Sequence, residues 1–94
     1  FVQEDIKVYW NIVNSENDNI TVLFSVPKKI VPLATKRNKI KRLLRESYRI
    51  HKSILNHNKL ELNLGFICLS SNFDDMNKIE EKIKLILHRL NQEI

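Results

Sequence analysis

Residues 60–71, LELNLGFICLSS, predict a strand whose centre is apolar on both faces. Phe66, Ile67 and Cys68 are consecutive apolar residues, whereas a strand with one face in water alternates apolar and polar side chains. A strand that is apolar on both faces belongs in the interior of a sheet. We therefore expect the rest of the chain to build a small sheet around this segment.

Two earlier segments, DIKVYWNIV (residues 5–13) and ITVLFSVP (residues 20–27), alternate apolar and polar residues and predict strands with one buried face. Their apolar positions are Ile6, Val8, Trp10 and Ile12 in the first segment and Ile20, Val22, Phe24 and Val26 in the second. The intervening segment NSENDN is rich in turn-forming residues. We expect the two strands to pair with each other as an antiparallel hairpin.

Two further segments have helical periodicity. Thr35 is the expected N-cap of the first helix, which ends near residues 56–58, and SNFDD caps the second. The apolar stripe of the first is Ile40, Leu43, Leu44, Ser47, Tyr48, His51, Ile54 and Leu55, and that of the second is Met76, Ile79, Ile83, Ile86, Leu87, Leu90 and Ile94. The order strand, strand, helix, strand, helix predicts an α+β fold, an α/β sandwich of two helices on a sheet of three to four strands.

The length of 94 residues predicts one domain, residues 1–94. Cys68 is the single cysteine, so an internal disulfide is excluded, and its apolar neighbours predict an unreactive core thiol. The chain holds no apolar run of the roughly 20 residues that cross a bilayer. We expect a cytoplasmic protein without membrane contact.

The positive charge of the chain is concentrated in residues 28–52. The net charge is +5, and this segment carries ten Lys and Arg residues against one acid, Glu46. The cations are Lys28, Lys29, Lys36, Arg37, Lys39, Lys41, Arg42, Arg45, Arg49 and Lys52. Clustered cations are typical of proteins that bind nucleic acids.

The segment KRNKIKRLLRE, residues 36–46, begins the predicted helix with cations, although a helix N-terminus favours acids. Like charges four residues apart also destabilise a helix, by about 0.2–0.5 kcal/mol per pair. Arg37, Lys41, Arg45 and Arg49 ascend one side of the helix, with Arg42 beside them. Phosphate groups would supply the missing negative charge, so we expect this face to bind nucleic acid. An ordinary solvated helix face is the alternative.

Two other features suit a nucleic-acid ligand. Arg37 and Asn38 stand at the predicted helix start, where backbone N–H groups lack intrahelical partners and can receive a phosphate. Tyr9 lies on the polar face of its strand, where an aromatic ring can stack on a base. A half-exposed strand tyrosine without such a role is the alternative.

The sequence offers no self-sufficient active site. His51, His57 and His88 are not spaced with cysteines or carboxylates as zinc ligands are, and the Asp74–Asp75 pair suits helix capping. No Ser-His-Asp order or glycine-rich phosphate loop is present. We therefore predict no catalytic residue and no metal site in the protein.

Two spaced motifs carry a resemblance to a known family. FSVPKK (residues 24–29) is followed, after seven residues, by RNKIKRLLRE (residues 37–46). Together they resemble the signature of the bacterial ribonuclease P protein subunit, a strand ending in Ser-Val-x-Lys-Lys and a helix with Arg-Asn-Arg-x-x-Lys-Arg-x-x-Arg-Glu. Pro27 and the longer connector are most similar to the Bacteroidetes branch of that family.

The resemblance implies a monomeric protein that joins a catalytic RNA to remove the 5′ leader from precursor tRNA. Its RNA partner performs the chemistry with Mg²⁺, so the protein binds no cofactor of its own and does not cleave alone. Carried over by position, the residues facing the catalytic RNA are Lys28, Lys29, Arg37, Asn38, Lys39, Lys41, Arg42 and Arg45. The leader lies in a cleft on the sheet, with Tyr9 near it. The family's strand-helix-strand crossover is left-handed.

The sequence departs from the family pattern in three places. Lys39 replaces the second Arg of the motif, and Ile30, Val31 and Pro32 replace the usual glycine after the lysine pair. The family's N-terminal helix and most of its first strand have no counterpart before Phe1, so we expect a truncated version. Two other functions are the alternatives to a ribonuclease P protein subunit. One is a general RNA- or DNA-binding module of the ribosome-associated type, and the other is a stand-alone nuclease.

Overall fold

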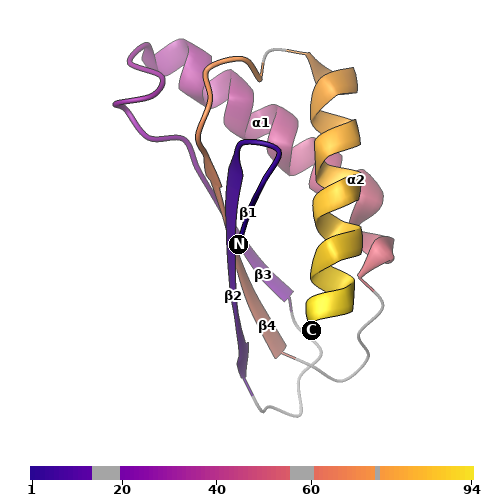
Figure 1. The fold of residues 1–94 in the computed structure, drawn as a ribbon. Coiled ribbons are helices and arrows are strands. Elements are labelled where there is room, and N and C mark those ends of the chain that lie inside the picture. The colour runs from indigo at the N-terminus through magenta and orange to yellow at the C-terminus, as the bar shows by residue number, and fades with distance from the viewer. Residues whose placement is uncertain (14–19, 56–60, 74) are drawn as a thin grey trace.

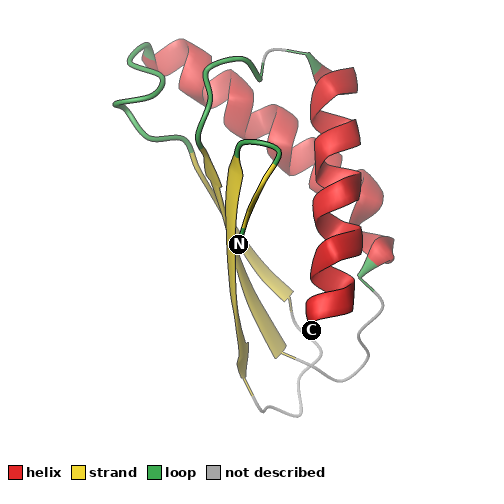
Figure 2. Cartoon of the chain, in the orientation of Figure 1, coloured by secondary structure: helices red, strands yellow, loops and turns green. Residues whose placement is uncertain are grey.

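The computed structural model describes residues 1–13, 20–55, 61–73 and 75–94. The predicted order of strands and helices is confirmed, with one short strand added at the start. The elements are β1 (Val2–Gln3), β2 (Ile6–Val13), β3 (Ile20–Ser25), α1 (Ala34–His51), a 3₁₀ turn (Lys52–Ile54), β4 (Glu61–Cys68) and α2 (Met76–Glu93). The fold is α+β, with both helices on one side of a four-stranded mixed sheet (Figures 1 and 2).

Strand β4 lies inside the sheet, as its two apolar faces predict. The strand order is β1-β2-β4-β3, with β4 antiparallel to β2 and parallel to β3. The expected hairpin between β2 and β3 is therefore wrong, because β4 separates these strands. The chain passes from β3 through α1 to the parallel strand β4, which is the predicted crossover. Its left hand stays a prediction.

The core fills the space between the sheet and the two helices. On β4, Leu62, Leu64, Phe66 and Cys68 are buried at alternate positions, while Asn63 of the opposite face is exposed. Phe66 stacks on Phe24 of β3 with ring centroids 5.4 Å apart. The helices contribute Ile40 and Leu44 of α1 and Ile79, Ile83, Ile86, Leu87 and Leu90 of α2, all with 0% exposure. The helical spacing of these residues places them on one face of each helix, so α1 turns its other face outward.

Helix α1 begins earlier and ends sooner than the sequence indicates. Leu33 occupies the N-cap position and makes no side-chain cap bond, so Thr35 is not the N-cap. The helix ends at His51 and continues as a 3₁₀ turn to Ile54, whereas the predicted end, residues 56–58, lies outside the described residues. Helix α2 has the expected cap, because the Asp75 side chain accepts a hydrogen bond from the Asn77 amide at 2.9 Å. Asp74 lies outside the described residues.

The turn between β1 and β2 has an unusual backbone for its sequence. Gln3 pairs with Ile6, and the two residues between them, Glu4 and Asp5, have positive φ angles of 56° and 60°. Two consecutive positive φ angles define a type I′ turn, which favours Asn-Gly. Lys82 of α2 approaches the Glu4 carboxylate at 3.5 Å, and the Asp5 carbonyl accepts a hydrogen bond from the Leu69 amide at 2.8 Å. These contacts hold the turn in a conformation that glycine would adopt more easily.

We predict that Asp5→Gly stabilises the fold. Relief of the left-handed conformation outweighs the chain entropy that glycine adds, and the net gain in unfolding free energy is about 0.5–1 kcal/mol. Urea unfolding followed by Trp10 fluorescence measures it. Asp5→Ala is the matched control, because it removes the same charge but keeps a Cβ atom at a residue with φ of 60°. A loss of stability in Asp5→Gly equal to that of the control would contradict this explanation of the turn.

Candidate nucleic-acid interface

The outward face of α1 is a cationic surface. Asn38, Arg42, Arg45 and Arg49 are exposed and fall within a sector of about 60° on the helix, taking about 100° per residue. Lys41 and Lys39 flank this sector on its two sides. The first turn of the helix contains no acid, and the buried residues Ile40, Leu44 and Ser47 lie on the opposite side. The structure thus brings six of the predicted contact residues onto one surface.

Arg49 differs from the other cations of this surface because it has an acidic partner. Its guanidinium contacts both carboxylate oxygens of Glu46, with Nε at 3.2 Å from Oε2. This hydrogen bonding lowers the pKa of Glu46 and raises that of Arg49. By contrast, Lys39, Lys41, Arg42 and Arg45 make no ion pair with any described residue. These four are the cations of the surface whose charge no described acid compensates.

Lys28 and Lys29 stand at the tip of a turn just before α1. The Pro27 carbonyl accepts hydrogen bonds from the amides of Ile30 and Val31, both at 3.0 Å, and closes the turn. Both lysines are exposed, whereas Val31 is buried. The lysine pair therefore projects beside the start of the helix.

Arg37 and Asn38 do not supply free backbone amides, contrary to the sequence prediction. The Arg37 amide donates to the Leu33 carbonyl at 3.0 Å, which is the first hydrogen bond of the helix. Because the helix starts at Ala34, the amides without intrahelical partners are those of residues 34–36. The Asn38 side chain is exposed, while the Arg37 guanidinium donates to two loop carbonyls.

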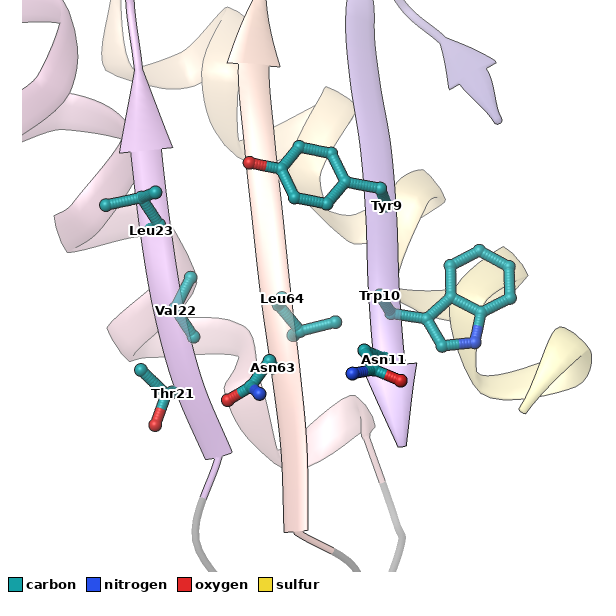
Figure 3. A pocket seen from close by; sticks show the side chains of 8 residues that line it. All are labelled: Tyr9, Trp10, Asn11, Thr21, Val22, Leu23, Asn63 and Leu64. Atoms are coloured by element: carbon teal, nitrogen blue, oxygen red, sulfur yellow. The ribbon is translucent and has the colours of Figure 1, made fainter. Parts of the chain in front are cut away.

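The sheet face away from the helices carries Tyr9. Its aromatic ring lies across Gly65, the residue directly opposite it on β4, and points toward Leu23 of β3 (Figure 3). A Cβ atom at Gly65 would lie 2.1 Å from Tyr9 Cζ, so the ring fits only because this residue is glycine. Tyr9 is 46% exposed, and one ring face remains open to solvent. The prediction that Tyr9 lies on the open face is confirmed, and its role in stacking stays a prediction.

A hollow of about 430 Å³ lies beside the Tyr9 ring. Its lining residues are Tyr9, Trp10, Asn11, Thr21, Val22, Leu23, Asn63 and Leu64. Asn63 pairs with Asn11 on one side and with Thr21 on the other, which makes a row of hydrogen-bonding side chains across three strands (Figure 3). Sequence reasoning missed this row. The alternation of β2 places Asn11 on the polar face, but only the strand order brings Asn11, Asn63 and Thr21 together.

The described residues contain no group of three or more His, Cys, Asp or Glu side chains placed to hold a metal ion. Cys68 is buried and donates to the Ser70 carbonyl at 3.0 Å, and burial raises the pKa of its thiol. A protonated, buried thiol is a poor nucleophile. Neither helix in the described part of the chain has the length and apolar character needed to cross a membrane.

Comparison with known proteins identifies relatives. The family model described as Ribonuclease P matches residues 1–91. A ribonuclease P protein component from Porphyromonas gingivalis is 34% identical over 74 residues, covering 74% of this chain and 54% of that protein. A ribonuclease P protein component from Chlorobaculum tepidum is 61% identical over 36 residues, which cover 38% of this chain and 23% of the Chlorobaculum protein.

A solved structure supports the same relationship. The ribonuclease P protein of Staphylococcus aureus superimposes with a TM-score of 0.75 at 28% identity, covering 96% of this chain and 78% of that one. The present chain spans between about a quarter and a half of the two curated relatives described above. Because the family match extends over nearly all of its residues and the fold agrees, the chain belongs to the ribonuclease P protein family.

Proposed function

We propose that this chain acts as the protein subunit of ribonuclease P, an endoribonuclease complex that removes the 5′ leader from precursor tRNA. The observation that carries the proposal is the cationic surface of α1, whose Lys39, Lys41, Arg42 and Arg45 have no acidic partner among the described residues. Family membership identifies the RNA that such a surface would bind, namely the catalytic RNA of the complex. The protein itself is non-catalytic in this proposal.

The contact with the catalytic RNA is electrostatic. Arg42 and Arg45 at the centre of the surface neutralise RNA phosphates and release counterions, which favours binding. Lys28 and Lys29 extend the surface beyond the helix start, where the free amides of residues 34–36 can also donate to a phosphate. Arg49 contributes less than its neighbours, because Glu46 competes for its guanidinium.

The open face of the sheet suits the single-stranded leader. An unpaired base can stack on the exposed ring face of Tyr9, while the amides of Asn11 and Asn63 offer donors and acceptors beside it. The precursor tRNA would then touch a surface distinct from the one that holds the catalytic RNA. The catalytic Mg²⁺ belongs to the RNA in this proposal, and no protein residue is assigned to it.

We predict that Arg42→Ala combined with Arg45→Ala weakens binding to the catalytic RNA and lowers the slope of log affinity against log salt by about one for each cation removed. Filter binding across a salt series measures both effects, and cleavage of precursor tRNA at low Mg²⁺ should fall in parallel. The control is Lys84→Ala, an exposed cation of α2. Equal affinity of the native protein for an unrelated structured RNA would favour a general basic RNA-binding module instead.

We predict that Tyr9→Ala weakens binding of precursor tRNA to the reconstituted complex by about 5- to 150-fold, since stacking on one base contributes about 1–3 kcal/mol. Binding of mature tRNA, which lacks the leader, should not change. Tyr9→Phe keeps the ring and should behave like the native protein. An equal loss for precursor and mature tRNA would show that Tyr9 does not contact the leader.

A further inference from the structure

Arg37 differs in its environment from the other arginines at the start of α1. Its Nη1 atom donates to the Val31 carbonyl at 3.0 Å and to the Pro32 carbonyl at 2.7 Å. The residue is half-buried, whereas Arg42 and Arg45 are exposed. One nitrogen of its guanidinium is thus committed to the protein backbone.

The two carbonyls that Arg37 contacts end the turn that presents the lysine pair. Hydrogen bonds from the amides of Ile30 and Val31 to the Pro27 carbonyl close this turn. Val31 is only 2% exposed and anchors the end of the turn in the core. Arg37 reaches back from the first turns of α1 and ties that anchored end to the helix.

A cation that donates to carbonyl oxygens makes stronger hydrogen bonds than a neutral donor does. Two such bonds from one nitrogen fix the backbone of residues 31 and 32 relative to the helix axis. The preceding residues, Lys28 and Lys29, are then held in place before any ligand arrives. Ordering a loop in advance reduces the entropy that binding must overcome.

We propose that Arg37 is a positioning residue, which holds Lys28 and Lys29 beside the start of α1 and acts on the RNA through them. This inference rests on the proposed function, because its effect is read in RNA binding. It differs from the expectation that Arg37 itself faces the RNA. The two roles predict different couplings between Arg37 and the lysine pair.

A double-mutant cycle separates these roles. It compares Arg37→Ala in the native background and in a background carrying Lys28→Ala and Lys29→Ala, with affinity for the catalytic RNA as the measurement. We expect Arg37→Ala to weaken binding about fivefold in the native background and less than about twofold without the lysines. Arg42→Ala, the control, should cost the same in both backgrounds. An equal loss for Arg37→Ala in both backgrounds would overturn the proposal.

A second measurement needs no RNA. Trypsin cleavage after Lys28 and Lys29, followed by mass spectrometry on the free protein, reports how firmly the turn is held. Arg37→Met keeps the aliphatic stem and removes the donors, so it should speed this cleavage while the unfolding free energy stays close to that of the native protein. Unchanged cleavage would overturn the proposal. If the native protein fails to bind the catalytic RNA, the proposed function fails, and this assay still decides the role of Arg37.

Discussion

The arrangement of the molecule depends on the burial of β4 between β2 and β3. Leu62, Leu64 and Phe66 face the helices, and Gly65 on the other side lies beneath the Tyr9 ring. Because β4 takes hydrogen bonds from both neighbours, β2 and β3 cannot pair with each other, and the chain must cross over through α1. The sheet therefore has one face covered by helices and one face open to solvent (Figure 2).

This division leaves two separate surfaces, to each of which the proposed function assigns a nucleic acid. The buried stripe of α1 faces the core, so its exposed sector, which includes Arg42 and Arg45, points outward. The open face of the sheet instead presents an aromatic ring and amides around a hollow. Phosphate neutralisation suits the first surface and contact with unpaired bases suits the second. Under the proposed function, the first surface would hold the folded catalytic RNA while the second holds the single-stranded leader.

Much of this could be predicted from the sequence. Helical periodicity revealed both helices and the cationic face, and the run of apolar residues at Phe66, Ile67 and Cys68 revealed the interior position of β4, because each pattern lies within one element. The β2–β3 hairpin was wrong because nearness in sequence favours pairing, whereas β4 reaches the same position through a crossover. The row of Asn11, Asn63 and Thr21 depends on register between three strands. The inward turn of Arg37 depends on where the helix starts, and Thr35 as N-cap placed that start too late.

The central claim is that α1 binds the catalytic RNA while the open sheet face binds the leader. Photo-crosslinking tests it most directly, with a probe attached through Asn38→Cys on α1 or Asn63→Cys on β4, since buried Cys68 should not react. In the reconstituted complex with precursor tRNA, the account predicts that the probe at position 38 attaches to the catalytic RNA and the probe at position 63 to the 5′ leader. Attachment of both probes to the same RNA strand would contradict it.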